Sequence, residues 1–152
     1  MDAPTIATEP PWLTIAREEI GVHETPGPEH TLRILEYFDA TRTEPYDGDE
    51  TPWCAAFVSW CLERAGVRSA RSAGARAYLN WGVEVPSPIP GAVAVLTRPE
   101  GGELAGHVTF VLMPLLRGFV GLGGNQGNAV STRPYAPRRV LSYRWPDGVP
   151  VP

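Results

Sequence analysis

The sequence TPWCAAFVSWCLERAG, residues 51–66, predicts one helix with a cysteine in its first turn, and the rest of the chain can be arranged around it. Pro52 suits the first turn, where no backbone N–H is needed, and Gly66 suits the position after the last turn. Apolar residues recur at steps of three and four, which is typical of one helix face; they are Cys54, Phe57, Val58, Cys61, Leu62 and Ala65. We therefore predict a helix that packs against a neighbouring layer.

Cys54 lies in the first turn of this helix, where a thiol ionises most easily. Unpaired backbone N–H groups and the positive end of the helix dipole favour an anion there and lower the pKa of a thiol. Cys61 lies about 10 Å further along the axis at ~1.5 Å per residue, beyond the roughly 7 Å that a disulfide allows between Cα atoms. We expect two free thiols, with Cys54 as a nucleophile and Cys61 as a small buried apolar residue.

The composition is that of an ordinary globular domain, with 152 residues, of which 43% are hydrophobic and 20% charged. A net charge of -4 argues against nucleic acid as a partner, although all 13 basic residues are arginine. No stretch approaches the roughly 18 apolar residues of a membrane span, and the start, MDAPTIATEPPW, lacks the pattern of a signal peptide. We expect a monomer without a membrane or nucleic-acid partner, made in the cytoplasm and delivered elsewhere by other means.

Helical patterns come first along the chain and strand-like patterns second. Besides residues 51–66, we predict helices over residues 11–21, 29–40 and 72–81, and a proline-rich loop over 83–92. Short strands follow, rich in β-branched and aromatic residues, as in an antiparallel meander; they are AVAVLTR (92–98), HVTFVLM (107–113), FVGLGG (119–124), AVSTRPY (129–135) and RVLSYRW (139–145).

This order predicts an α+β fold in which the N-terminal helices pack on one face of a C-terminal antiparallel sheet. We expect one domain over residues 11–146, with a loose lead-in over 1–10 and a short tail over 147–152.

A thiolate nucleophile needs a base and a group that orients the base. Of the three histidines, His107 opens a strand directly after Gly106, on the sheet that the cysteine helix must pack against, whereas His23 and His30 flank a proline-rich connector. We predict His107 as the base. The segment LGGNQGN offers amides for the third position, and Asn125 is the candidate nearest the strand; the others are Gln126 and Asn128. The competing interpretations are a surface histidine and a plain turn.

Metal and cofactor sites are not expected. The chain has no CxxC or HExxH spacing, so zinc is disfavoured. Asp47, Asp49 and Glu50 could gather Ca²⁺, but the remaining calcium-loop pattern is missing, so a solvated loop is the better interpretation.

The segments DETPWCAAFVSWCLERAG, PGAVAVL, GHVTFV and GGNQGN, in that order, resemble the CHAP and NlpC-like cysteine peptidases and amidases of the papain-like fold. The chain is most similar to small bacterial and phage proteins with a DETPWC motif, and the resemblance extends from about Pro11 to Trp145. It implies a papain-like fold and hydrolysis of an amide or peptide bond in bacterial peptidoglycan. The expected substrate is then the stem peptide, and an immunity or delivery protein is a further candidate partner.

The resemblance also implies roles for individual residues. Cys54 carries over as the nucleophile that forms a thioester, His107 as the general base, and Asn125 as the residue that orients the imidazole. Trp53 and Gln126 are candidate substrate-binding residues, with packing beneath the groove as the alternative for Trp53. The place of action would be the periplasm or cell wall, after delivery by a phage or a secretion system.

Two other functions fit the same residues. One is a non-catalytic wall-binding or effector module that keeps the fold without turnover. The other is a deamidase toxin that acts on protein glutamines.

Overall fold

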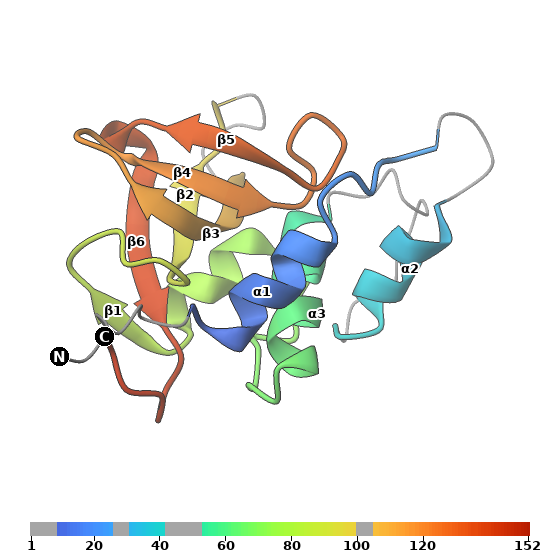
Figure 1. Cartoon of the computed structure of the whole chain (residues 1–152), viewed down its shortest axis with the longest axis horizontal. Coiled ribbons are helices and arrows are strands. Elements are labelled where there is room, and N and C mark those ends of the chain that lie inside the picture. Colours follow the sequence, from blue (N-terminus) through green and yellow to red (C-terminus); the bar gives the residue numbers. More distant parts are fainter. Residues whose placement is uncertain (1–8, 26–30, 42–52, 100–104) are drawn as a thin grey trace, which may run out of the picture.

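The computed structural model describes residues 9–25, 31–41, 53–99 and 105–152, which form helices followed by one sheet (Figure 1). The helices are α1 (Pro11–Glu18), α2 (Leu32–Phe38), α3 (Cys54–Arg64) and the 3-10 helix η2 (Ala75–Asn80). They lie together on one side of the sheet (Figure 1). The predicted α+β arrangement, with N-terminal helices packed on a C-terminal antiparallel sheet, is confirmed.

Six strands form the sheet in the order β1-β6-β2-β3-β4-β5, and every neighbouring pair is antiparallel. Their bounds are β1 Val83–Val85, β2 Val93–Thr97, β3 Gly106–Pro114, β4 Phe119–Gly123, β5 Ser131–Tyr135 and β6 Val140–Trp145. Each of the strand patterns that the sequence contains therefore forms a strand.

The sheet differs from a simple meander at its last strand. Strands β2 to β5 follow one another, but β6 returns to the free edge of β2 instead of extending beyond β5. The reason is burial. The first four residues of β2 are fully buried, which requires a neighbouring strand on each side, whereas the middle of β5 is exposed and can form an edge. β6 in turn pairs with β1, a short edge strand within the predicted loop over residues 83–92. The loop prediction is therefore wrong for those three residues.

Helix α3 is the centre of the molecule and is buried on all sides except at its last two residues. Every residue from Cys54 to Leu62 is buried, so the single apolar face that the spacing predicts is an underestimate. The reason is that α3 packs against β3 on one side while α1 and α2 cover the others. Its end is as predicted: Gly66 has a φ of +78° and the Val67 N–H donates to the Leu62 carbonyl at 2.9 Å, which is the Schellman ending of a helix.

The other predicted helices are present but shorter. α1 begins at Pro11 as predicted and ends at Glu18, before Gly21, which has a φ of +103°. α2 begins at Leu32, whereas the predicted helix begins at residue 29; residues 29 and 30 lie outside the described part of the chain. The helix expected over residues 72–81 is a 3-10 helix, η2.

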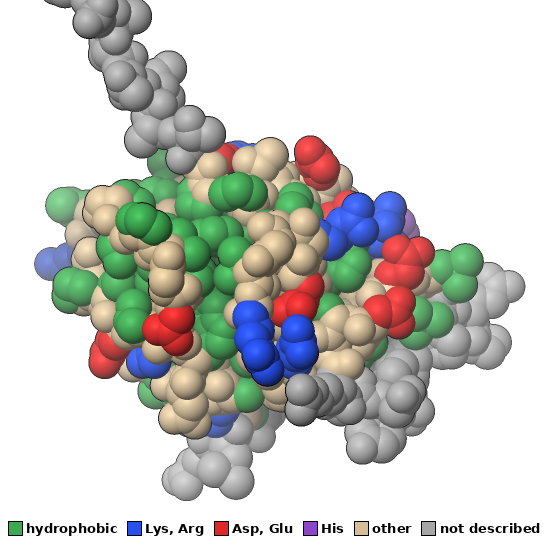
Figure 2. Space-filling view, turned by 90° about the horizontal axis from the view of Figure 1, so that it is seen from below, with side chains coloured by type: hydrophobic (Ala, Val, Ile, Leu, Met, Phe, Trp, Pro, Cys, Tyr) green, Lys and Arg blue, Asp and Glu red, His purple; other side chains and the backbone are tan. Residues whose placement is uncertain are grey.

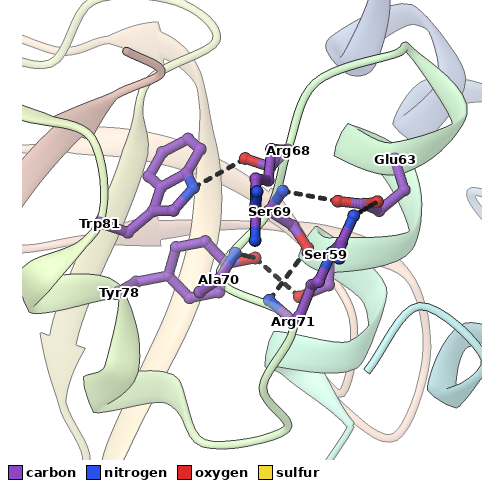
Figure 3. A network of polar contacts seen from close by, with 8 residues as sticks. All are labelled: Ser59, Glu63, Arg68, Ser69, Ala70, Arg71, Tyr78 and Trp81. Carbon is purple, nitrogen blue, oxygen red and sulfur yellow. Dashed lines mark hydrogen bonds and ion pairs between the residues drawn. The ribbon is translucent and has the colours of Figure 1, made fainter. Parts of the chain in front are cut away.

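A network of polar groups fixes α3 against the segment that carries η2 (Figure 3). The Ser59 and Tyr78 hydroxyl groups, both buried, lie 2.7 Å apart, and the Ser69 N–H donates to a Glu63 carboxylate oxygen at 2.6 Å. Buried polar groups are costly when unpaired, so these bonds favour one position of the helix. The helix that begins with Cys54 is therefore held firmly at its middle and end.

Residues near the two ends of the described chain pack against each other. The Trp12 indole N–H donates to the Gly91 carbonyl at 2.7 Å, and its ring packs edge-on against Trp145 with centroids 5.5 Å apart. The Trp145 indole N–H donates to the Val149 carbonyl at 3.0 Å, and Val149 packs against the core. Part of the predicted tail therefore folds back onto the domain.

The surface carries both signs of charge. On the face seen from below, acidic and basic side chains lie beside one another among hydrophobic ones (Figure 2). Ion pairs among the described residues include Arg71 with Glu63 and Arg33 with Glu19. Within the part of the chain that the structure describes, no helix has the length and apolar character needed to cross a membrane.

Candidate active site

Cys54 is the first residue of α3, at the point where the helix meets the start of β3. Cys54 is only 4% exposed, and its thiol forms a hydrogen bond with the His107 side chain. The backbone N–H groups of Val108 and Ala55 also donate to it. Among the described residues no side chain caps this end of the helix, so none competes with an anion for its first backbone N–H groups. The structure thus brings together the two residues that the sequence pattern pairs.

The surroundings of the pair favour its charged form. Burial raises the pKa of the Cys54 thiol, but the positive charge and hydrogen bond of His107 and the two N–H donors outweigh it, so this pKa is lowered. Burial likewise lowers the pKa of His107, but the thiolate and the hydrogen bonds to Cys54 and Gln126 outweigh it, so the pKa of the imidazole is raised. Opposite shifts of this kind favour a thiolate–imidazolium ion pair.

The third member of the site is Gln126. Its Oε1 lies 3.0 Å from Nε2 of His107 and accepts a hydrogen bond from the Tyr135 hydroxyl at 2.9 Å. Its amide nitrogen donates to the carbonyls of Ser131 at 2.7 Å and Gly121 at 3.3 Å, which fixes the orientation of the amide. An oxygen faces the ring, so Nε2 carries a proton and donates, which leaves Nδ1 to face the thiol.

The prediction that Asn125 orients the imidazole is therefore corrected. β4 ends at Gly123, and Asn125 takes a left-handed conformation with a φ of +58° that turns the chain back. This turn brings the next side chain, that of Gln126, under the ring, whereas Asn125 lines the pocket beside it. Tight packing places the turn: a Cβ on Gly124 would lie 2.7 Å from the Trp53 ring.

The two residues expected to bind substrate lie in the interior instead. Gln126 is only 3% exposed and its side chain is engaged by the bonds described above. Trp53 is fully buried, stacks on Tyr37 with ring centroids 5.9 Å apart, and donates from its indole nitrogen to a Glu24 carboxylate oxygen at 2.7 Å. The alternative interpretation of Trp53, packing beneath the site, is the one that the structure supports.

The remaining histidines and acidic residues do not join this site in the described structure. The main chain of His23 pairs with Ala129 and so supports the loop that contains Gln126. His30, Asp47, Asp49 and Glu50 lie outside the described residues. Among residues 9–25, 31–41, 53–99 and 105–152, no three histidine, cysteine or carboxylate side chains cluster as metal ligands would.

An open pocket of about 180 Å³ adjoins the imidazole. Its lining is polar and, among the described residues, contains arginine and no acidic residue; the described lining residues are Arg98, His107, Asn125, Asn128, Arg133, Tyr135 and Arg139. Sequence analysis missed the arginines because they come from three separate elements. The sequence contains one indication of these arginines. Arg98 directly follows a strand and Arg133 lies within one, in the same C-terminal half of the chain as the predicted base.

One protein-family model matches part of the chain. The family model of the CHAP domain matches residues 46–113, which include Cys54 and His107, so the resemblance to CHAP proteins is confirmed. CHAP domains are generally hydrolases that act on peptidoglycan. No curated protein matches the chain. The matched segment ends before Gln126, so the assignment of the third residue rests on the geometry alone.

Proposed function

Because the chain carries a CHAP domain, we propose that it is a cysteine hydrolase that cleaves an amide or peptide bond in bacterial peptidoglycan. The observation that carries this proposal is the contact between the Cys54 thiol, at the start of a helix, and the imidazole of His107. A low thiol pKa beside a base is what a nucleophilic cysteine requires. The substrate lies outside the cytoplasmic membrane, so the proposal places the reaction in the cell wall.

In the first half of the reaction the Cys54 thiolate attacks the carbonyl carbon of the scissile amide. The carbonyl oxygen becomes an oxyanion, and the backbone N–H of Cys54, the first residue of the helix, is the donor that we propose to stabilise it. His107, protonated in the ion pair, gives its proton to the amide nitrogen as the carbon–nitrogen bond breaks. A thioester remains on Cys54, and the amine fragment leaves.

In the second half water hydrolyses the thioester. The neutral His107 takes a proton from the water as its oxygen attacks the thioester carbon, and the carbon–sulfur bond breaks. The acyl fragment leaves as a carboxylic acid and the thiolate–imidazolium pair is restored. Gln126 acts throughout as a positioning residue, because its oxygen holds the proton on Nε2 and leaves Nδ1 facing the sulfur.

The same observations argue against a module that only binds the wall. A buried cysteine without chemistry should have a raised pKa, as Cys61 does through burial and the nearby charge of Glu19. Cys54, which is also buried, has a lowered pKa. The two cysteines of one helix therefore differ in the property that a nucleophile needs.

Digestion of purified sacculi tests the proposal. The wild type and Cys61→Ala should release soluble muropeptides, and mass spectrometry should find a new amine and a new carboxylate at one bond. Cys54→Ala should release none while keeping the circular dichroism spectrum of the wild type. Wall digestion by Cys54→Ala, or none by a folded wild type, overturns the proposal. Release of ammonia without new amino termini would point to the deamidase alternative.

A further inference from the structure

The pocket beside His107 carries a concentration of positive charge that the rest of the chain does not have. Arg98, Arg133 and Arg139 line it, and its described lining contains no carboxylate. The whole chain has the opposite balance, with 17 acidic and 13 basic residues. Among the described residues, the ion pairs involve other arginines, namely Arg17, Arg33 and Arg71. The positive charge of the pocket is therefore not neutralised by the described part of the protein.

Arg139 is held in place for a ligand. Its Nη2 donates to the Thr97 carbonyl at 2.7 Å, and its guanidinium lies over the Tyr135 ring at 5.2 Å from the centroid. Its Nε is buried and has no hydrogen-bond partner within the described structure. The charge also acts on His107, where it opposes the larger effects of Cys54 and Gln126 that raise the pKa of the imidazole, so guanidinium and imidazole share one electrostatic environment. A guanidinium fixed by these contacts suits a planar anion.

Arg133 approaches the pocket from β5, the exposed edge strand. A Cβ on Gly127 would lie 3.7 Å from its Nη2, so the guanidinium is beside the turn that contains Asn125 and Asn128. The amide side chains of this turn add hydrogen-bond donors to the charge of the arginines. The pocket thus combines positive charge with neutral donors.

The chemistry of the dyad decides which part of a substrate enters this pocket. The pocket includes the imidazole of His107 but not the thiol of Cys54. His107 protonates the nitrogen that leaves, so this nitrogen lies between the sulfur and the ring, and the fragment attached to it extends over the ring. The fragment that leaves as an amine therefore occupies the arginine pocket.

We propose that the scissile bond lies on the amino side of a residue that bears a free carboxylate, and that Arg133 and Arg139 bind this carboxylate. The inference rests on the proposed function, because it assigns the substrate side by the proton that His107 gives to the leaving amine. Binding between a guanidinium and a carboxylate is bidentate and selective against an uncharged amide. The enzyme therefore discriminates between free-acid and amidated forms of the same stem peptide.

A matched pair of peptides tests this inference. Once the cleaved bond is known from sacculi, two synthetic stem peptides are made that differ only in a carboxylate or a carboxamide on the amine-side residue. The wild type should cleave the free acid with a kcat/KM higher by roughly 10- to 100-fold, the range for a hydrogen bond to a charged group. The preference should fall as ionic strength rises.

Variants of the arginines locate the effect. Arg133→Gln should reduce the ratio of kcat/KM for the free acid to kcat/KM for the amide towards one, mainly by raising KM for the free acid. Arg139→Gln should do the same. Arg138→Gln is the control, because Arg138 is exposed, lies next to Arg139 in the 3-10 helix η4 (Pro137–Arg139), and does not line the pocket. It should keep the full preference. The pH profile of Cys54 alkylation checks that Arg133→Gln leaves the dyad intact.

Two results overturn the inference while the proposed function stands: equal cleavage of the two peptides by the wild type, or a preference that survives in both arginine variants. A wild type that cleaves neither the peptides nor sacculi overturns the proposed function, and the inference falls with it.

Discussion

The Nε2 atom of His107 lies 3.0 Å from the Oε1 atom of Gln126, whose amide is fixed by two backbone carbonyls on its other side. The imidazole thus faces an oxygen that cannot rotate away. Since this oxygen accepts a hydrogen bond from the Nε2–H group, it stabilises the imidazolium and, through it, the Cys54 thiolate. The loop GGNQGN is therefore part of the site, through its fourth residue.

Replacing Gln126 should change the pH at which the thiol ionises. In Gln126→Leu the imidazolium loses its acceptor, so the pKa of His107 falls towards its ordinary value and the pKa of Cys54 rises. Activity should fall by roughly 10- to 100-fold, by analogy with the partners that orient metal-bound histidines. Alkylation of Cys54 by iodoacetamide across pH measures the shift. Asn125→Gly, which keeps the left-handed turn, should leave this alkylation profile unchanged, and the opposite pattern would restore Asn125 as the orienting residue.

Cys61 should be dispensable for chemistry. It is fully buried in the middle of α3, and burial raises the pKa of its thiol, so it should react with alkylating reagents only after unfolding. Cys61→Ala should retain activity and lose about 1 kcal/mol in the free energy of unfolding, comparable to removal of one buried methyl group. Urea denaturation and sacculus digestion check this, and loss of activity in a folded variant would contradict it.

The bond between Trp53 and Glu24 should matter for stability and not for substrate binding. In Trp53→Phe the ring that stacks on Tyr37 remains, but the hydrogen bond to the carboxylate is lost, at a cost of about 1.5–3 kcal/mol. Trp81→Phe also loses an indole hydrogen bond, to the Arg68 carbonyl, at a more exposed site, so it should cost less. Urea denaturation measures the free energy of unfolding of each variant, and kinetics measure its KM. A higher KM for Trp53→Phe without loss of stability would show contact with substrate instead.

Gly124 should be intolerant of a side chain. A Cβ there would lie 2.7 Å from the Trp53 ring and 2.8 Å from the Cβ of Phe57, so the turn that carries Gln126 could no longer reach α3. Gly124→Ala should cost about 1–3 kcal/mol as an overpacked site and lower kcat. Gly74→Ala is the control, because its Cβ would meet only Ser72 Oγ at 3.4 Å. Equal stability of the two variants would show that the close approach is unimportant.

Much of the fold follows from local sequence patterns. The period of the apolar residues and the Pro and Gly signals correctly predict the strands and the helix that begins at Cys54, because these patterns depend on neighbours along the chain. The position of β6 beside β2 depends instead on which edge needs covering, which is a property of the assembled sheet. Periodicity therefore predicts the elements better than their order in space.

The site shows the same limit. The helix start and the strand start indicate Cys54 and His107, but the choice between Asn125 and Gln126 depends on the left-handed conformation of Asn125, which no periodicity reports. The buried indole of Trp53 has its hydrogen-bond partner in Glu24, a residue 29 positions away. The arginine pocket is likewise assembled from elements that are distant in sequence.

The most direct test of the account is the rate of Cys54 alkylation by iodoacetamide as a function of pH, measured in Cys61→Ala so that one thiol remains. The lowered pKa of Cys54 and the raised pKa of His107 predict a thiolate that forms below the ~8.5 of a free cysteine. His107→Ala should move the midpoint upward, because burial is then no longer offset by the imidazolium. A midpoint at the ordinary thiol value, unchanged by His107→Ala, would contradict the ion pair on which the proposed chemistry depends.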